Sequence, residues 1–138
     1  MRKSLLILFI LLNVILLAAF SYPTEKLLDP EKLVETLKNT SVKKPIIYNV
    51  GPSEMIPGAI LIGETINPAN QNKFKTALIN IPTNSEIIIY CGCCKIADCW
   101  NIHEAHTILT SMGFTNFKIL NLKTDFKTDW IDKKYPLQ

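Results

Sequence analysis

Arginine is almost absent from this chain, because Arg2 is the only one among its 138 residues. Without arginine the chain lacks the planar guanidinium fork that grips oxyanions, and lysine offers only a point charge instead. A strong net charge is missing as well. The formal value is +3, and setting aside Arg2 and Lys3 leaves 13 lysines against 12 acidic residues. We therefore expect no nucleic-acid partner for this protein.

One long hydrophobic run is present, and it lies at the start of the chain. After a short basic segment, Leu5–Phe20 is nearly all apolar. As a helix it would span about 24 Å, less than the roughly 30 Å hydrocarbon core of a bilayer. Small residues, Ala19 and Ser21, stand at −3 and −1 of a cut before Tyr22. We expect a signal peptide over 1–21, an exported (periplasmic or secreted) protein and no stable membrane span after cleavage. An uncleaved anchor is the alternative.

The rest of the chain alternates short apolar runs with amphipathic stretches, and it has the composition of one compact domain. We expect an N-terminal segment and helix over 22–43, followed by the main domain over 44–138. Strands are predicted over Ile46–Val50, Ala59–Ile62, Glu86–Tyr90 and Phe117–Leu120. Helices are predicted from Pro30, over Asn70–Ile79, over Asn101–Met112 and over Asp125–Ile131. This alternation predicts a single α/β domain with a mostly parallel central sheet flanked by helices on both faces.

Four polar or aromatic residues around the predicted helices receive structural roles. Asp29 is expected to cap the helix that starts at Pro30, and Asp98 the helix that starts near Asn101. Trp100 and His106 are expected to be packing residues. None of these four is predicted to carry chemistry.

The cysteines are the most informative feature of the sequence. All four fall within nine residues, Cys91-Gly-Cys-Cys-Lys-Ile-Ala-Asp-Cys99. Cys91 follows a predicted buried strand directly, and ligands bind at the carboxyl ends of strands in α/β sheets. The cluster runs into the helix near Asn101, whose amino terminus directs N–H groups and partial positive charge at the loop. A thiol in that position is favoured as the nucleophilic thiolate.

The residues alone leave other interpretations of this cysteine loop open. An exported protein often holds structural disulfides, and Cys99 is then the expected partner of Cys93 or Cys94. A soft metal such as Cu(I) or zinc is a second alternative, with His103 as a further candidate ligand. Thiol–disulfide exchange by a strained, reducible bridge is a third, and inert cysteines are a fourth.

Four landmarks, in order, carry a resemblance to a known family. The stretch from about Lys44 to Pro136 resembles a single rhodanese-like domain. Its first core strand corresponds to Pro45-Ile-Ile-Tyr-Asn-Val50, and its "HIPGA" turn to Met55-Ile-Pro-Gly-Ala-Ile60. The strand that ends in the family's catalytic cysteine corresponds to Ile87-Ile-Ile-Tyr-Cys91. The helix and strand that follow correspond to Ala105–Phe114 and Asn121-Leu122, and Trp130 and Tyr135-Pro136 loosely match the closing segment.

This resemblance implies a sulfurtransferase, similar to thiosulfate sulfurtransferases, that holds a sulfane sulfur as a persulfide on Cys91. The implied anion-cradling loop consists of Gly92, Cys93, Cys94, Lys95, Ile96 and Ala97. Cys99 and His103 are candidates for an accessory thiol or substrate contact. The implied partners are a small anionic sulfur donor and a thiol or other sulfur acceptor, with no cofactor and no metal. The alternative is a catalytically inactive rhodanese-fold binding module whose cysteine loop is bridged by disulfides or binds metal.

The chain also departs from the usual family pattern. Asn49 and Gly51 stand where Asp and Arg are usual, Met55 replaces the His of the turn, and the loop is longer and lacks arginine. The sequence resembles a subgroup of exported rhodanese-like proteins with a loop of the form Cys-Gly-Cys-Cys…Cys-x-Asn. The missing loop arginine argues against a phosphatase of the related fold, because that group grips phosphate.

Overall fold

The computed structural model describes residues 19–138. Most of the predicted signal peptide, up to residue 18, lies outside the described residues. Among the helices within 19–138, each is too short or too polar to cross a membrane.

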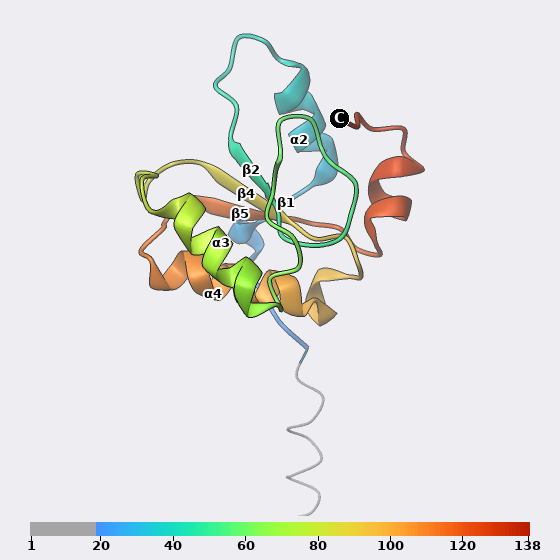
Figure 1. Cartoon of the computed structure of the whole chain (residues 1–138). Coiled ribbons are helices and arrows are strands. Elements are labelled where there is room, and N and C mark those ends of the chain that lie inside the picture. Colours follow the sequence, from blue (N-terminus) through green and yellow to red (C-terminus); the bar gives the residue numbers. More distant parts are fainter. Residues whose placement is uncertain (1–18) are drawn as a thin grey trace, which may run out of the picture.

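A five-stranded sheet forms the centre of the protein (Figure 1). Its spatial order is β1-β5-β4-β2-β3, and every neighbouring pair is parallel. The strands are β1 (Leu27–Leu28), β2 (Ile46–Asn49), β3 (Ile60–Leu61), β4 (Ile87–Tyr90) and β5 (Phe117–Leu120). This arrangement confirms the predicted single α/β domain. Because β4 lies in the middle of the sheet, all four of its side chains are buried, as the unbroken apolar run predicted.

Helices cover both faces of the sheet (Figure 1). They are α2 (Pro30–Lys38), α3 (Pro68–Leu78) and α4 (Trp100–Ser111), with short turns η1 (Thr24–Lys26), η2 (Ile96–Asp98) and η3 (Lys127–Ile131). Successive strand residues point to opposite faces. Ile87 and Ile89 of β4 therefore pack in the same core cluster as α3 and α4, whereas Ile88 and Tyr90 pack in the cluster that contains α2 and η3.

Segment 22–43 belongs to this sheet structure through two elements. β1 was not predicted, and it pairs with β5, Leu27 opposite Ile119. Two residues are too short a run for a sequence pattern to identify as a strand. The helix α2 was predicted, and it buries Leu33 and Val34 against the sheet.

The structure places one of the two predicted capping residues at the N-cap position and the other outside it. Asp29 occupies the N-cap position of α2, but its side chain makes no capping hydrogen bond. The prediction for Asp98 is wrong, because Cys99 is the N-cap of α4. The short turn η2 places Asp98 one residue too early, and its carboxylate pairs with the Lys95 ammonium at 3.2 Å.

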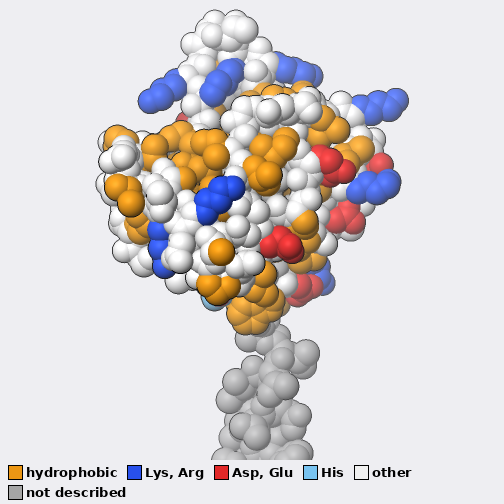
Figure 2. All heavy atoms as spheres, in the orientation of Figure 1, with side chains coloured by type: hydrophobic (Ala, Val, Ile, Leu, Met, Phe, Trp, Pro, Cys, Tyr) orange, Lys and Arg blue, Asp and Glu red, His pale blue; other side chains and the backbone are white. Residues whose placement is uncertain are grey.

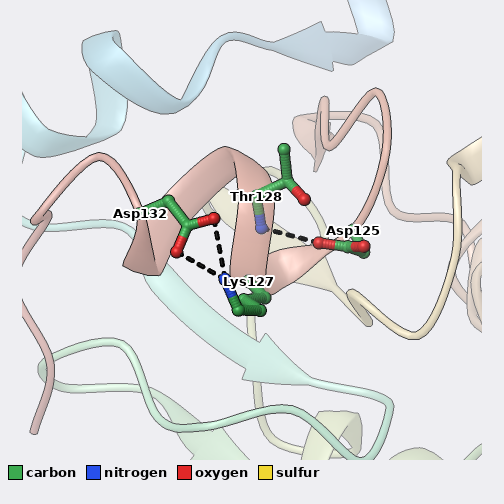
Figure 3. Close-up of polar contacts among 4 residues, drawn as sticks. All are labelled: Asp125, Lys127, Thr128 and Asp132. Carbon is green, nitrogen blue, oxygen red and sulfur yellow. Dashed lines mark hydrogen bonds and ion pairs between the residues drawn. The ribbon is translucent and has the colours of Figure 1, made fainter.

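The segment around η3 is closed by local polar contacts (Figure 3). The Thr128 backbone N–H donates to the Asp125 carboxylate at 2.6 Å, and Lys127 pairs with Asp132 at 2.7 Å. Between these groups, Phe126 and Trp130 turn inward and stack on each other with ring centroids 5.9 Å apart. The segment therefore presents Phe126 to the end of β4.

The outer surface carries both charged and apolar side chains. On the face seen in Figure 2, hydrophobic side chains are widely exposed, and lysine and acidic groups lie among and around them. Ile60 and Leu61 of the edge strand β3 are 45% and 51% exposed.

Candidate functional site

Cys91 lies at the carboxyl end of β4, in the middle of the sheet, as the sequence predicted. Its exposed fraction is only 1%, so it is buried more deeply than a loop cysteine is expected to be. Pairing between the strands continues to this point, because the Val50 N–H donates to the Tyr90 carbonyl at 2.9 Å. The chain that follows β2 therefore runs directly beside Cys91.

Gly51 makes room for the Cys91 thiol. A Cβ atom at Gly51 would lie 2.2 Å from the Cys91 Sγ and 2.8 Å from its Cα. Distances below about 3 Å do not occur between such atoms, so only glycine fits there. This contact gives a physical reason for a residue without a side chain where the resembling family carries one. It also leaves no space at this position for an arginine.

Asn49 shapes the turn that passes beside Cys91. Its buried side-chain oxygen accepts from the Gly51 N–H at 3.0 Å, and its amide nitrogen donates to the Ser53 carbonyl at 2.7 Å. The Ser53 hydroxyl in turn donates to the Cys91 carbonyl. One side chain thus joins the end of β2 to the start of the cysteine loop.

Gly92 turns the chain sharply after Cys91. Its φ of 78° lies in the left-handed region that favours glycine. A Cβ there would also lie 2.4 Å from the Phe126 Cβ and 2.5 Å from the Ser53 Oγ. The Phe126 N–H donates to the Gly92 carbonyl at 3.0 Å, so the segment around η3 holds this turn in place.

The turn brings the thiols together. The Cys93 Sγ lies 3.2 Å from the Cys91 Sγ, 3.2 Å from the Cys94 Sγ and 3.7 Å from the Cys99 Sγ. All four are free thiols. Cys91 and Cys99 are buried, Cys94 is half-buried, and Cys93 is exposed. The site is a pair of buried thiols beneath an exposed one.

Asn101 completes the surroundings of Cys91, and sequence reasoning gave it no role. Its side-chain nitrogen donates to the Cys91 Sγ at 3.4 Å, while its oxygen accepts from the Ile66 N–H at 2.9 Å. The second bond fixes which end of the amide faces the sulfur. The Cys-x-Asn pattern of Cys99 and Asn101 could have indicated this role in the sequence, because it places the Asn101 side chain in the first turn of α4.

These donors make Cys91 the acidic thiol of the cluster. Hydrogen bonding with Cys99, then the Cys93 backbone N–H and thiol and the Asn101 amide, lowers the pKa of Cys91 to about 6, although burial opposes this. Burial and hydrogen bonding to Cys94 and Cys91 raise the pKa of Cys93 to about 12. The hydrogen bond to Cys91, burial and the Cys91 charge raise the pKa of Cys99. Of Cys91, Cys93 and Cys99, Cys91 is therefore the one that ionises most readily.

The two predicted local cations do not join the cluster. The Lys95 ammonium pairs with Asp98. The His103 ring stacks on Phe20, with centroids 4.1 Å apart, and meets Trp100 edge-on at 5.6 Å. Of the two predicted accessory residues, the structure brings Cys99 to the site, whereas within residues 19–138 His103 forms no hydrogen bond with a thiol.

The two residues predicted to pack do make packing contacts. Trp100 contacts Phe20 edge-on at 4.8 Å and remains 56% exposed. His106 is half-buried between Tyr22 and Phe117, with ring centroids 5.2 and 5.3 Å away.

A separate cavity of about 320 Å³ is lined by residues from the start of α2, the end of β5 and the region of η3. Its lining residues are Asp29, Pro30, Glu31, Asn121, Lys123, Asp129, Lys133 and Tyr135. The thiols do not line it, and we base the functional assignment on the thiol cluster, because nucleophilic chemistry is concentrated there.

The sulfur atoms also have the spacing of a metal-binding set. The Sγ atoms of Cys91, Cys93 and Cys99 all lie within 4.8 Å of one another. Three thiolates around one zinc or copper ion stand about 4 Å apart, given metal–sulfur bonds of roughly 2.3 Å. The three thiols therefore fit one soft metal ion after small side-chain adjustments.

No family model matches the chain, and no curated protein matches it either. The fold and the site together define a class of protein. It is a single all-parallel α/β domain with a cluster of four thiols at the carboxyl end of its central strand.

Proposed function

We propose that this protein is an exported, rhodanese-like sulfurtransferase that carries a sulfane sulfur as a persulfide on Cys91. One observation carries the proposal: the thiol at the end of the central strand accepts a hydrogen bond from the Asn101 amide at 3.4 Å and lies 3.2 Å from the Cys93 thiol. Hydrogen bonding with Cys99 and with these groups lowers the pKa of Cys91. The thiolate is the nucleophilic form of cysteine. Cys91 is therefore ready to react at neutral pH without help from an arginine.

The loading step requires only an anionic sulfur donor, for which thiosulfate serves as the example. The Cys91 thiolate attacks the outer sulfur of thiosulfate, a new S–S bond forms, and the old S–S bond breaks as sulfite leaves with its electron pair. No oxidant or reductant is consumed. The product is a persulfide anion on Cys91, and a nucleophilic acceptor removes the outer sulfur in a second step.

The surroundings of Cys91 suit a sulfur that stays anionic throughout this cycle. The Asn101 amide donates to the sulfur, and the Cys93 N–H and the Cys99 thiol are the other donors that favour the charged form. Hydrogen bonds to an ionised acceptor are about twice as strong as bonds between neutral groups. They replace the charge of the loop arginine that is usual in the resembling family.

The order of elements supports the resemblance to rhodanese-like domains. Pro45–Val50 contains β2, the turn at Pro57-Gly58 leads into β3, and Cys91 follows β4. Neighbouring parallel strands bring these landmarks to one end of the sheet. The ends of β2 and β4 therefore lie side by side at the position of Cys91.

Intact-mass measurement after incubation of the reduced protein with thiosulfate tests this proposal. We expect a gain of about 32 Da, the mass of one sulfur, that reducing agent removes. The Cys91→Ser variant should show no gain. Cys94→Ser is the matched control, because it removes a thiol of the same loop that is not in contact with Cys91, and it should still gain the mass. Absence of the adduct in the wild-type protein would defeat the proposal.

The thiol spacing favours a second candidate function, a binding module for a soft metal. Cys91, Cys93 and Cys99 would be the ligands, and thiolates select Cu(I) and zinc. Titration of the reduced protein with Cu(I) against a coloured chelator tests it. Strong one-to-one binding that is lost in Cys99→Ser, without any thiosulfate-dependent mass gain in the wild type, would favour this function over sulfur transfer.

A further inference from the structure

Cys91 is buried, and it contacts an exposed thiol, that of Cys93. Cys91 is 1% exposed, as is Cys99, whereas Cys93 is exposed to solvent. The Cys93 Sγ lies 3.2 Å from the Cys91 Sγ. A sulfur added to Cys91 needs the length of an S–S bond, about 2 Å, plus a non-bonded contact distance to Cys93, and together these exceed the separation of the two Sγ atoms. A sulfur added to Cys91 therefore comes into immediate contact with the Cys93 thiol.

We propose, on the basis of the sulfur-carrier function above, that sulfur leaves the buried Cys91 by transfer to Cys93, which then presents it to the thiol of a protein acceptor. An acceptor thiol on a folded protein cannot approach a side chain that is 1% exposed. The exposed Cys93, in contrast, is open to such an acceptor. In this relay Cys91 holds the transferred sulfur, and Cys93 delivers it to the acceptor.

The transfer between the cysteines balances without another reactant. The Cys93 sulfur attacks the outer sulfur of the Cys91 persulfide, a new S–S bond forms on Cys93, and the S–S bond to Cys91 breaks. The Cys91 Sγ departs with the electron pair as a thiolate, and the proton that Cys93 gives up goes to the transferred sulfur, which was the anionic end of the persulfide. One thiol and one persulfide exchange places, so the number of electrons on the protein does not change.

The other two cysteines do not meet both requirements of a relay. Cys99 is buried, and its Sγ is 3.7 Å from that of Cys93. Cys94 is half-buried, and its Sγ makes its 3.2 Å contact with Cys93, not with Cys91. Of the four, only Cys93 is both exposed and in contact with Cys91.

The acidity of Cys91 suits it to the role of leaving group in this transfer. Exchange is faster when the leaving thiol has the lower pKa. Hydrogen bonding with Cys99 and its other neighbours lowers the pKa of Cys91, so Cys91 leaves the transferred sulfur more readily than an ordinary thiol would.

Loading by a small donor follows a different route. An ion as small as thiosulfate or cyanide needs far less space than a folded protein, and exposed side chains such as that of Cys93 change rotamer within nanoseconds. A folded protein still cannot enter. Small and large acceptors should therefore depend on Cys93 to different extents.

The test uses the full chain, loaded with thiosulfate and freed of excess donor, and two acceptors. One acceptor is cyanide, which takes sulfur as thiocyanate, and the other is a folded test protein with a single surface cysteine. The readout is the ratio of the protein-thiol rate to the cyanide rate. In Cys93→Ser we expect this ratio to fall about tenfold or more, because serine cannot carry sulfur. In the control Asn116→Ala, which removes only an exposed amide bond to the Asn84 carbonyl, it should stay within about twofold of wild type.

Alkylation of the loaded wild-type protein followed by peptide fragmentation gives a second readout, with sulfane sulfur expected on both Cys91 and Cys93. An unchanged ratio in Cys93→Ser, an equal fall in Asn116→Ala, or sulfane sulfur only on Cys91 would overturn the relay. Those results leave the carrier function intact. A wild-type protein that never takes up sulfur from thiosulfate would overturn both proposals, so the two failures are distinguishable.

Discussion

At the scale of single residues, the site depends on a few residues of two kinds. Some must be glycine because their neighbours leave no space for a side chain, and others are held in one orientation by hydrogen bonds. Cys91 is acidic because several donors converge on it, and they converge because Gly51 and Gly92 let the backbone come close. Asn101 is held by a second hydrogen bond to the Ile66 N–H. Each of these residues gives a separate prediction.

Replacing Gly51 by alanine should disturb Cys91 directly. The new Cβ would meet the Cys91 Sγ and Cα at 2.2 and 2.8 Å, and overpacking of this kind costs about 1–3 kcal/mol of unfolding free energy. We also expect slower alkylation and slower sulfur loading of Cys91. Gly58→Ala is a control for Cys91 reactivity: its Cβ meets nothing within 4 Å, although its φ of 78° makes alanine unfavourable for stability there. Equal Cys91 reactivity in the two variants would show that the close approach is unimportant.

Replacing Asn101 by alanine should raise the pKa of Cys91, because a donor to the thiolate is lost. It also leaves the Ile66 N–H without its acceptor, at a cost of about 1–3 kcal/mol. The pH profile of Cys91 alkylation should move to higher pH than in the wild type. Asn116→Ala removes only an exposed amide bond to the Asn84 carbonyl and should leave the profile in place. A profile that does not move in Asn101→Ala would exclude this residue from the site.

The sequence placed Cys91 at the end of the central strand but did not show which side chains surround it. Cys91 was predictable because it ends an apolar run at the point where parallel strands bind ligands. The contact of Cys93 with Cys91 depends on the left-handed turn at Gly92 and on Phe126, 34 residues away in the sequence. Contacts between distant segments leave no periodic pattern to detect. His103 was expected near the thiols, but its ring stacks on Phe20 instead.

At the scale of secondary-structure elements, long apolar runs were predicted well and short elements were missed. The strands β2, β4 and β5 lie where isoleucine-rich segments predicted them. The missed elements, β1, η1 and η2, contain two or three residues each, although the two-residue strand β3 lies within a predicted strand. Asp98 was assigned as a cap because the turn before α4 has no sequence signal of its own. Short elements depend on neighbours in space more than on local preference.

The segment around η3 should stabilise the cysteine loop as well as the core. Phe126 is buried, stacks on Tyr90 and Trp130, and contacts Gly92. Phe126→Ala should therefore lower the unfolding free energy by about 3–5 kcal/mol and make Cys91 more accessible to alkylation. Urea unfolding and alkylation rates check the two effects.

Lys127→Ala is the matched control for this change. It removes the exposed ion pair with Asp132 (Figure 3), and exposed pairs contribute little to stability. We expect no measurable change in unfolding or in Cys91 reactivity. If Phe126→Ala behaved like Lys127→Ala, the segment would have no part in supporting the loop.

At the scale of the whole molecule, the N-terminal segment 22–43 is structurally inseparable from the sheet. Its helix α2 covers one face with Leu33 and Val34, which are 0% and 6% exposed, and its strand β1 covers the edge of β5. A chain that starts at residue 44 would expose this apolar face to water. We expect residues 44–138 alone to aggregate or to unfold at much lower urea concentration than residues 22–138. Equal urea midpoints would show that 22–43 is dispensable.

The central claim concerns the charge state of Cys91 during sulfur transfer, and the pH dependence of loading tests it most directly. Thiosulfate is added at a series of pH values, and the sulfur on Cys91 is measured by peptide mass. Because the pKa of Cys91 is lowered to about 6, the thiolate persists well below the usual pH range of cysteine. The initial loading rate should be half-maximal near pH 6 and level above about pH 7. Half-maximal loading near pH 8.5, the value of an ordinary thiol, or sulfur on another cysteine alone, would contradict the account.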